Sequence, residues 1–205
     1  SSESFNEKLY EKDKSKRLKY GQVGLYKAVK VNGKWAEITP LPFNSKSYST
    51  SNPSLSKDDN TLYFSSNMPG SVGGYDIWKV NINSNGTCGK PENLGNKINT
   101  PGDEGFPFVT DDGVLYFASN GLTGFGGLDV FSADLNTNST PINLGKPVNS
   151  EKDDFAFSFN KEKNGGYLSS NRSGEDNIYS SVPVCQAQIA TVVKNAKTGA
   201  LLANA

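Results

Sequence analysis

The sequence predicts an all-β protein, and three observations carry this prediction. Glycine, tyrosine and phenylalanine are abundant, with 21, 9 and 11 of the 205 residues, which is typical of turn-rich β-structure. No stretch of the chain shows the apolar period of an amphipathic helix. A segment of roughly 50 residues recurs along the chain, and a period of this size indicates a repeat architecture.

The first part of the repeat is an apolar run that ends in Ser-Asn, followed by a glycine-bearing loop and a new strand. The runs occupy residues 52–67, 105–120 and 154–171, and the strand starts occupy residues 74–79, 127–132 and 176–180. In the first copy, residues 62–65 follow an Asp-Asp-Asn turn, as a short strand does. Residues 77–82 alternate large and polar side chains, which predicts a half-buried strand.

The second part of the repeat is Asn-Leu-Gly, at residues 93–95 and 143–145, with Thr-Pro-Leu in its place at residues 39–41. Each copy leads to an asparagine followed by serine or threonine: Asn44-Ser45, Asn99-Thr100 and Asn149-Ser150. A unit with three or four short strands cannot bury both of its faces alone. We therefore expect the units to stack radially as blades of a β-propeller.

The chain enters this repeat partway through a unit. Residues 1–2 align with residues 65–66, and residues 24–27 align with residues 76–79. We therefore expect the first two strands of this unit to be missing, and its lysine-rich insertion at residues 8–19 to be a solvated loop. The last unit shows no Asn-Leu-Gly segment after its third strand, and we expect an upstream segment to supply that strand and close the ring.

The pattern Pro-x-Leu-Ser-x-Asp-(Asp/Gly)-x-x-Leu-Tyr-Phe-Ser-Ser-Asn, followed by Gly-Gly-x-Asp-Ile-Trp, resembles the WD40-like propeller repeat of the TolB type. It is clearest at residues 53–78 and 107–131, and weaker at 155–179, where Ala156 takes the place of the proline. The resemblance covers about residues 1–184 and implies four-stranded blades.

Residues 185–205 resemble the opening of a carboxypeptidase-regulatory-like β-sandwich. The predicted organisation is therefore a partial β-propeller over residues 1–184, followed by the first strands of a β-sandwich. The propeller is expected to comprise part of one blade and three further units.

This order of domains is similar to that of multidomain OmpA-family proteins of the Bacteroidota cell envelope, some of which are accessory parts of the type IX secretion and gliding machinery. The resemblance implies a periplasmic, outer-membrane-associated scaffold that binds protein partners. It implies contact with peptidoglycan only through a domain outside this chain. We therefore expect a non-enzymatic protein-interaction module, and the alternative is a propeller associated with a carbohydrate-active or peptidase enzyme.

Charge and composition argue against several function classes. The chain has 21 Lys+Arg and 21 Asp+Glu, and this zero formal net charge argues against nucleic-acid binding. With no histidine, the chain cannot form a Ser-His-Asp triad, while paired carboxylates of the glycosidase type stay open. No apolar run approaches the roughly 18 residues of a transmembrane helix. We expect no catalytic residue and no cofactor.

Acidic pairs recur in the loops: Asp58-Asp59, Asp103-Glu104, Asp111-Asp112 and Asp153-Asp154. Calcium takes about 6–8 convergent oxygen ligands, and these pairs fit β-turns better, so we expect no metal site. Cys88 and Cys185 could form a disulfide or serve as two separate small apolar residues, and their spacing does not decide between the two.

The candidate functional residues fall into two groups. Residues that recur once per unit are expected to build the blades: Pro53, Asp76, Trp78, Pro107, Asp129, Phe131 and Tyr179. For the two aspartates we expect acceptors of backbone N–H bonds in the preceding turn, with a ring of acids at one mouth of the propeller as the alternative. The expected partner contacts are basic residues of the insertion and aromatic residues of the loops: Lys14, Lys16, Arg17, Tyr48, Tyr75 and Phe125. The aromatic residues could instead pack onto a neighbouring blade.

Overall fold

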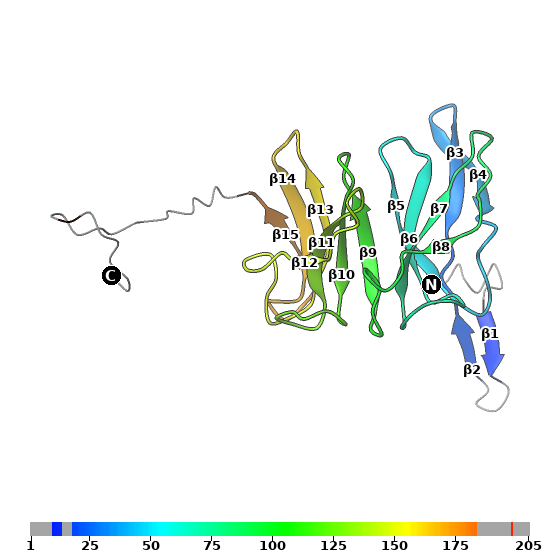
Figure 1. The fold of residues 1–205 in the computed structure, drawn as a ribbon. Coiled ribbons are helices and arrows are strands. Elements are labelled where there is room, and N and C mark those ends of the chain that lie inside the picture. The colour runs from blue at the N-terminus through cyan, green and yellow to red at the C-terminus, as the bar shows by residue number, and fades with distance from the viewer. Residues whose placement is uncertain (1–9, 14–17, 184–197, 199–205) are drawn as a thin grey trace.

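The computed structural model describes residues 10–13, 18–183 and 198, and in these residues the chain forms only β-strands and connecting loops (Figure 1). Blade 2 is a four-stranded antiparallel sheet of β5 (Thr50–Leu55), β6 (Thr61–Ser66), β7 (Asp76–Asn81) and β8 (Glu92–Asn93). Blade 3 repeats it with β9 (Glu104–Val109), β10 (Val114–Ser119), β11 (Asp129–Asp134) and β12 (Ile142–Asn143). The predicted all-β fold with four-stranded blades is confirmed.

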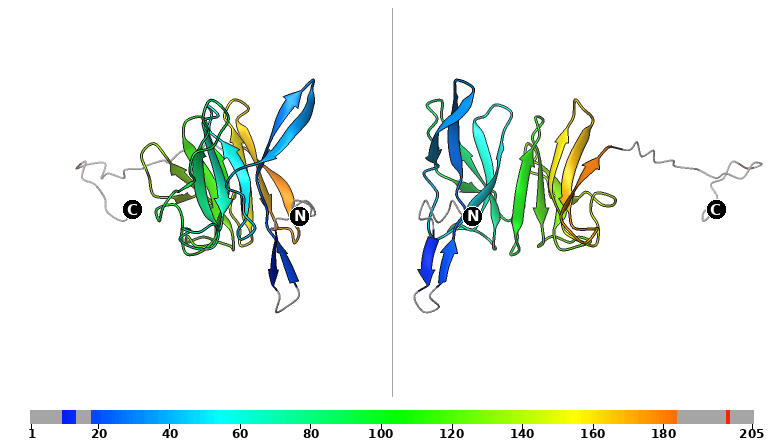
Figure 2. Two further views of the ribbon diagram at one scale, coloured as in Figure 1. Left: turned by 90° about the vertical axis from the view of Figure 1, so that its right-hand side faces the viewer. Right: turned by 180° about the vertical axis from the view of Figure 1, so that it is seen from behind.

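Two shorter sheets flank these blades. Blade 1 consists of β3 (Tyr26–Val31) and β4 (Lys34–Pro40), and blade 4 of β13 (Asp154–Asn160), β14 (Gly165–Ser170) and β15 (Asn177–Ser181). The blades stand side by side, and the first strands β5, β9 and β13 neighbour one another, as the innermost strands of a propeller do (Figures 1 and 2).

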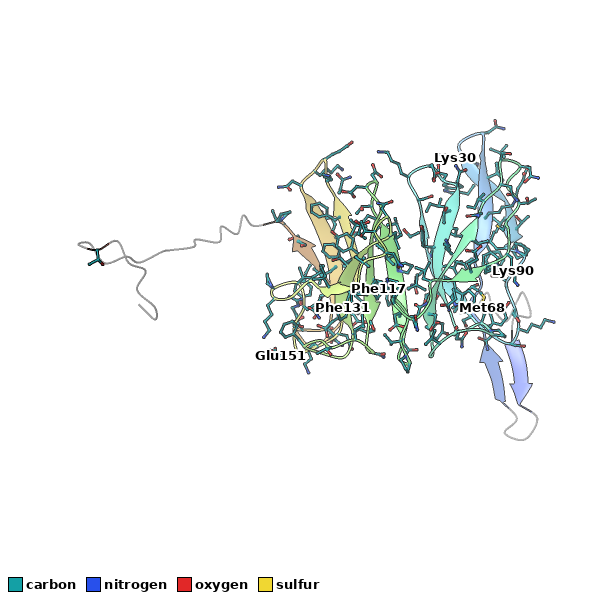
Figure 3. The ribbon with its side chains drawn as sticks, viewed as in Figure 1. Lys30, Met68, Lys90, Phe117, Phe131 and Glu151 are labelled. Carbon is teal, nitrogen blue, oxygen red and sulfur yellow. The ribbon has the colours of Figure 1, made fainter. Side chains whose placement is uncertain are left out.

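The apolar core lies between the blades because successive residues of a strand point to opposite faces of its sheet. On β7, Trp78 and Val80 face blade 1, while Ile77 faces blade 3. The blade 1–2 core contains Leu25, Leu41, Phe43, Leu62, Phe64, Met68, Trp78 and Val80. The blade 2–3 core contains Ile77, Ile98, Val109, Leu115, Phe117, Phe131 and Ala133, and the blade 3–4 core contains Val130, Phe157 and Leu168. Figure 3 shows Phe117 and Phe131 inside blade 3, where their ring centroids are 6.0 Å apart.

A β-bulge interrupts the first strand of blades 2, 3 and 4. One residue of each bulge has a positive φ: Asn52 (50°), Phe106 (54°) and Ala156 (52°). In blades 2 and 3 the next residue is the proline of the repeat, and in blade 4 it is Phe157. The expectation that Ala156 replaces the proline is therefore wrong by one residue. An alignment by residue type misses the register because the bulge, and not the proline, sets it.

The insertion of the first unit is not entirely a loop. Strands β1 (Tyr10–Asp13) and β2 (Leu18–Gly21) pair in antiparallel register from Tyr10 opposite Gly21 to Asp13 opposite Leu18, and this corrects the predicted solvated loop. Lys14, Lys16 and Arg17 lie outside the described residues, as do Cys185 and the predicted sandwich strands apart from residue 198. No helix able to cross a membrane occurs in the described part of the chain.

Candidate functional site

The asparagines that recur once per unit close the outer edge of each third strand. The Oδ1 atom of Asn99 accepts a hydrogen bond from the N–H of Ile77 (2.7 Å), and its Nδ2 atom donates to the C=O of the same residue (3.0 Å). Asn149 makes the same two bonds to Val130, at 2.8 and 2.9 Å. Because a side-chain amide carries both N–H donors and a carbonyl acceptor, it takes the place of a residue of a neighbouring strand. We call this arrangement the asparagine clamp.

Blade 1 carries the same clamp, and the fourth strands hold the clamps in place. Asn44 pairs with both backbone groups of Leu25, at 2.9 and 2.7 Å. In blade 2, the Oδ1 atom of Asn93 accepts a bond from Nδ2 of Asn99 (2.8 Å), and Asn143 serves blade 3 in the same way. The side-chain amides of the recurring asparagines therefore form hydrogen bonds within their own blades.

The two aspartates that precede the third strands organise the glycine-bearing loops. Asp76 accepts hydrogen bonds from the N–H groups of Val72 (2.7 Å) and Gly73 (3.2 Å), and its side chain is fully buried. Asp129 accepts the corresponding bonds from residues 125 and 126. The two carboxylates thus lie inside their own blades rather than at an open mouth.

A second pair of aspartates joins neighbouring blades. Asp103, just before blade 3, accepts a bond from the N–H of Tyr75 in blade 2 (2.8 Å), and the backbone N–H of Glu104 returns to the C=O of Tyr75 (2.6 Å). Between blades 3 and 4, Asp153 accepts from the N–H of Leu128 (2.9 Å). These bonds connect each first strand to the loop that precedes the third strand of the blade before it.

Glu104 carries a buried carboxyl group between blades 2 and 3, and hydroxyl groups donate hydrogen bonds to it. Its carboxylate accepts bonds from the N–H (2.7 Å) and Oγ1 (2.6 Å) of Thr100 and from Oγ of Ser119 (2.6 Å). Burial raises the pKa of Glu104 above its ordinary value because the charged form loses its water. The hydroxyl donors act in the opposite direction and favour the carboxylate.

Asp154 occupies the same position in blade 4, and there a cation accompanies it. The fully buried Asp154 accepts from the N–H (2.6 Å) and Oγ (2.8 Å) of Ser150 and forms an ion pair with Arg172. The guanidinium of Arg172 also donates to the C=O of Val148 and lies 4.9 Å from the ring centroid of Tyr179. Sequence reasoning missed this arginine because its ion-pair partner Asp154 lies 18 residues away along the chain and meets it only through the pairing of β13 with β14.

A groove lies where the first strands end and the following hairpins begin. We call it the strand-end groove. It has a volume of about 930 Å³ and an apolar floor that includes Leu55 of β5, Val109 of β9 and Phe159 of β13. An adjoining cavity of about 420 Å³ shares Phe108, Phe159 and Asn160 with it. Side chains from three blades therefore line one continuous surface.

Ion pairs between hairpins of neighbouring blades form the rim of the groove. Lys57 of blade 2 lies 3.0 Å from Asp111 of blade 3, and Lys161 of blade 4 lies 3.4 Å from Asp112. The pKa of Asp112 is lowered, first by the hydrogen bond from the Thr110 hydroxyl and also by Lys161. An apolar floor inside a charged rim is the arrangement found in protein-binding surfaces.

The adjoining cavity follows from a departure from the repeat in blade 4. Gly166 pairs with Ser181 there, whereas the same register places Leu62 opposite Val80 in blade 2 and Leu115 opposite Ala133 in blade 3. Those four apolar residues are all buried. Gly166 and Ser181 lack the apolar side chains that fill this layer in blades 2 and 3.

The three aromatic residues predicted to contact partners lie in different environments in the structure. Phe125 is 47% exposed, and its ring lies 5.6 Å from Nζ of Lys146. Tyr48 is half-buried against the blade 1–2 core, and its hydroxyl donates to the C=O of Phe43 (2.9 Å), so it packs rather than forming an exposed rim. Tyr75 is half-buried, and none of these three residues lines the strand-end groove.

Of the apolar repeat positions, Pro107 is buried and Pro53 is exposed, while the aromatic ones lie inside the blades. Trp78 and Phe131 are buried, and Tyr179 is half-buried against the blade 3–4 core. The indole N–H of Trp78 donates to the C=O of Ser66 (3.2 Å). Within the described ranges, no group of three or more His, Cys, Asp or Glu side chains is placed to hold a metal ion. Cys88 is half-buried against the blade 1–2 core.

No protein-family model matches this chain, and no curated protein matches it. Among solved structures, the chain is similar to TolB from Acinetobacter baumannii, with 15% identity and a TM-score of 0.50 over 87% of this chain and 36% of that one. A puromycin-hydrolyzing peptidase from Mycobacterium tuberculosis is 14% identical, with a TM-score of 0.49 over 84% of this chain and 25% of that one. The chain thus spans about a third of the length of TolB, and the likeness concerns the β-propeller fold alone.

Proposed function

We propose that this chain is a non-enzymatic protein-interaction module, and that the strand-end groove is its binding surface. The observation that carries the proposal is the groove itself, in which hairpins of three blades combine an apolar floor with an ion-paired rim. Its volume of about 930 Å³ has room for a few side chains of a protein segment.

The scaffolding role is supported by how the recurring polar residues are used. The carboxyl and amide groups of Asp76, Asn99, Glu104, Asn149 and Asp154 are buried, and they hold strands, loops and neighbouring blades together. A propeller held in this way presents its loops as a rigid surface. Guided by the resemblance to OmpA-family envelope proteins, we propose that this module belongs to an outer-membrane-associated periplasmic complex. Type IX secretion machinery is the candidate complex, and peptidoglycan would be bound only through a domain outside this chain.

Recovery of partners with tagged protein, followed by identification of the proteins retained, tests the proposal. We expect Leu55→Glu to remove the bound partners, because it places a charge on the apolar floor of the groove. Val72→Glu is the matched control, since Val72 is 45% exposed and Leu55 47% exposed, and Val72 does not line the groove. Equal recovery by both variants, or a hydrolytic activity of the purified chain that an acid-to-alanine change abolishes, would contradict the proposal.

A further inference from the structure

The chain contains four Asn-Gly pairs, and the asparagine of each pair is exposed: Asn32, Asn85, Asn120 and Asn164. In this dipeptide the backbone nitrogen of the glycine can attack the side-chain amide carbon of the asparagine, because glycine has no side chain to obstruct the approach. Exposure does not distinguish the four pairs. Their hydrogen bonds do, because a bonded amide or a bonded N–H must first be released before the two groups can meet.

In the pair at residues 85–86, hydrogen bonds hold both reacting groups. The Oδ1 atom of Asn85 accepts bonds from the N–H (3.0 Å) and Oγ1 (2.7 Å) of Thr87. The N–H of Gly86, which would make the attack, donates to the C=O of Asn83 (2.8 Å). We therefore expect the folded chain to protect Asn85 from this reaction.

The pair at residues 120–121 is held in a similar way by different partners. The Oδ1 atom of Asn120 accepts a bond from the backbone N–H of Asp103 (2.7 Å), and the N–H of Gly121 donates to Oγ of Ser119 (3.1 Å). Asn120 also lies beside the contact between blades 2 and 3 that Asp103 makes with Tyr75. Release of this asparagine would loosen a connection between blades, so we expect protection here too.

Asn32 has neither restraint. Asn32 and Gly33 form the turn of the β3–β4 hairpin with φ of 49° and 79°, as a type I′ turn requires. The ladder closes with Val31 opposite Lys34, so the N–H of Gly33 lies outside it. Among the residues that the structure describes, none forms a hydrogen bond to the side chain of Asn32. The tip of this hairpin points away from the other blades (Figure 2).

The pair at residues 164–165 shares only one of these two properties. The side chain of Asn164 also has no hydrogen bond within the described ranges. Gly165, however, belongs to β14 and lies opposite Asn160 in the ladder with β13, so its backbone is part of a sheet. Asn32 is therefore the asparagine whose amide and whose neighbouring glycine are both outside the hydrogen-bonded structure.

We propose that Asn32 is a modification site at which the folded chain deamidates without an enzyme. The backbone nitrogen of Gly33 forms a bond to Cγ of Asn32, and the amide nitrogen leaves as ammonia with the proton of the Gly33 N–H. Water then opens the cyclic succinimide at either carbonyl and leaves aspartate or isoaspartate. The hairpin thereby gains a negative charge between Lys30 and Lys34 in the sequence and, in the isoaspartate, an extra backbone carbon. This site is separate from the strand-end groove.

Incubation of the purified chain in mildly alkaline buffer, followed by peptide mapping with mass spectrometry, tests the proposal. In the folded chain we expect deamidation at Asn32 to be at least about tenfold faster than at Asn85 or Asn120, because those two pairs must first break hydrogen bonds. In concentrated urea the four pairs should react at similar rates, because the same dipeptide then has no folded structure around it. The urea sample is therefore the control within the same chain.

A variant tests whether hydrogen bonds set the order. Thr87→Val removes the hydroxyl bond to Asn85 and should raise the rate at Asn85 without changing the rate at Asn32. A rate at Asn32 in the folded chain that is no higher than at Asn85 and Asn120 would overturn the proposal. Faster reaction at Asn164 than at Asn32 would overturn it as well, because the position of the glycine in the ladder would then not matter.

Discussion

Two neighbouring interfaces, between blades 2 and 3 and between blades 3 and 4, share the same backbone arrangement. They differ in the side chains that fill them. The first buries seven apolar residues, and the second buries three. At the shared carboxyl position, the first holds Glu104 among hydroxyl groups, whereas the second pairs Asp154 with Arg172. The repeat therefore fixes where blades meet, and different physical interactions can hold them there.

The largest expected effect on stability comes from the buried apolar residues of the two interfaces. Phe117→Ala should lower the free energy of unfolding by about 3–5 kcal/mol, because the ring is 1% exposed in the blade 2–3 core. The equivalent change in blade 4, Leu168→Ala, should cost about 2–3 kcal/mol, since the apolar core around it is smaller. Urea denaturation measures both values, and a larger loss for Leu168→Ala would break the comparison.

The second-largest expected effect on stability comes from the ion pair between Arg172 and Asp154. Arg172→Met should lower the free energy of unfolding by about 2–4 kcal/mol, because it leaves the fully buried Asp154 without its cation. Blade 2 has Met68 and Thr50 at these two positions. The double variant Arg172→Met/Asp154→Thr copies that pair and should recover much of the loss in the same urea experiment. No recovery would mean that Arg172 acts through its other contacts.

The asparagine clamps are expected to rank third. Asn99→Ala should cost about 2–3 kcal/mol, because it leaves the buried N–H of Ile77 without a partner. The same change at Asn44, which is only partly buried, should cost less, because water can reach the freed groups. Thermal unfolding of the two variants compares them, and equal losses would show that burial does not set the strength of the clamp.

The smallest expected effect concerns pH. Because the pKa of Glu104 is raised in the folded state, the folded chain keeps this proton to higher pH than the unfolded chain does. The resulting stabilisation is complete below about pH 4, near the unfolded-state pKa, and is lost as the pH rises through the folded-state pKa. The wild type should therefore gain stability relative to Glu104→Gln as the pH falls from 8 to 4. Glu92→Gln, at an exposed position, is the control, and a parallel pH profile for Glu104→Gln would contradict the assignment.

The blades could be predicted from the sequence because their strands repeat residue types at similar spacing. The recurring asparagines were visible as well, but not their function, since a clamp is defined by backbone groups 19 or 22 residues away along the chain. The register of the bulge could not be read, because Asn52, Phe106 and Ala156 share a backbone angle and no chemical property.

The strand-end groove was not predicted for a related reason. Leu55, Val109 and Phe159 are ordinary strand-end residues in the sequence, and only the side-by-side packing of three blades brings them together. Tyr48 illustrates the opposite case. Its aromatic ring in a loop suggested a contact surface, yet a hydrogen bond to Phe43, five residues earlier, keeps it against the core.

The asparagine clamps also bear on solubility. An open strand edge is a template on which other chains can pair and aggregate. In blades 2 and 3 the fourth strand is only two residues long, and the clamp places a side-chain amide where the backbone of the third strand would otherwise be exposed. The outer rim of these blades therefore offers incoming chains little free backbone.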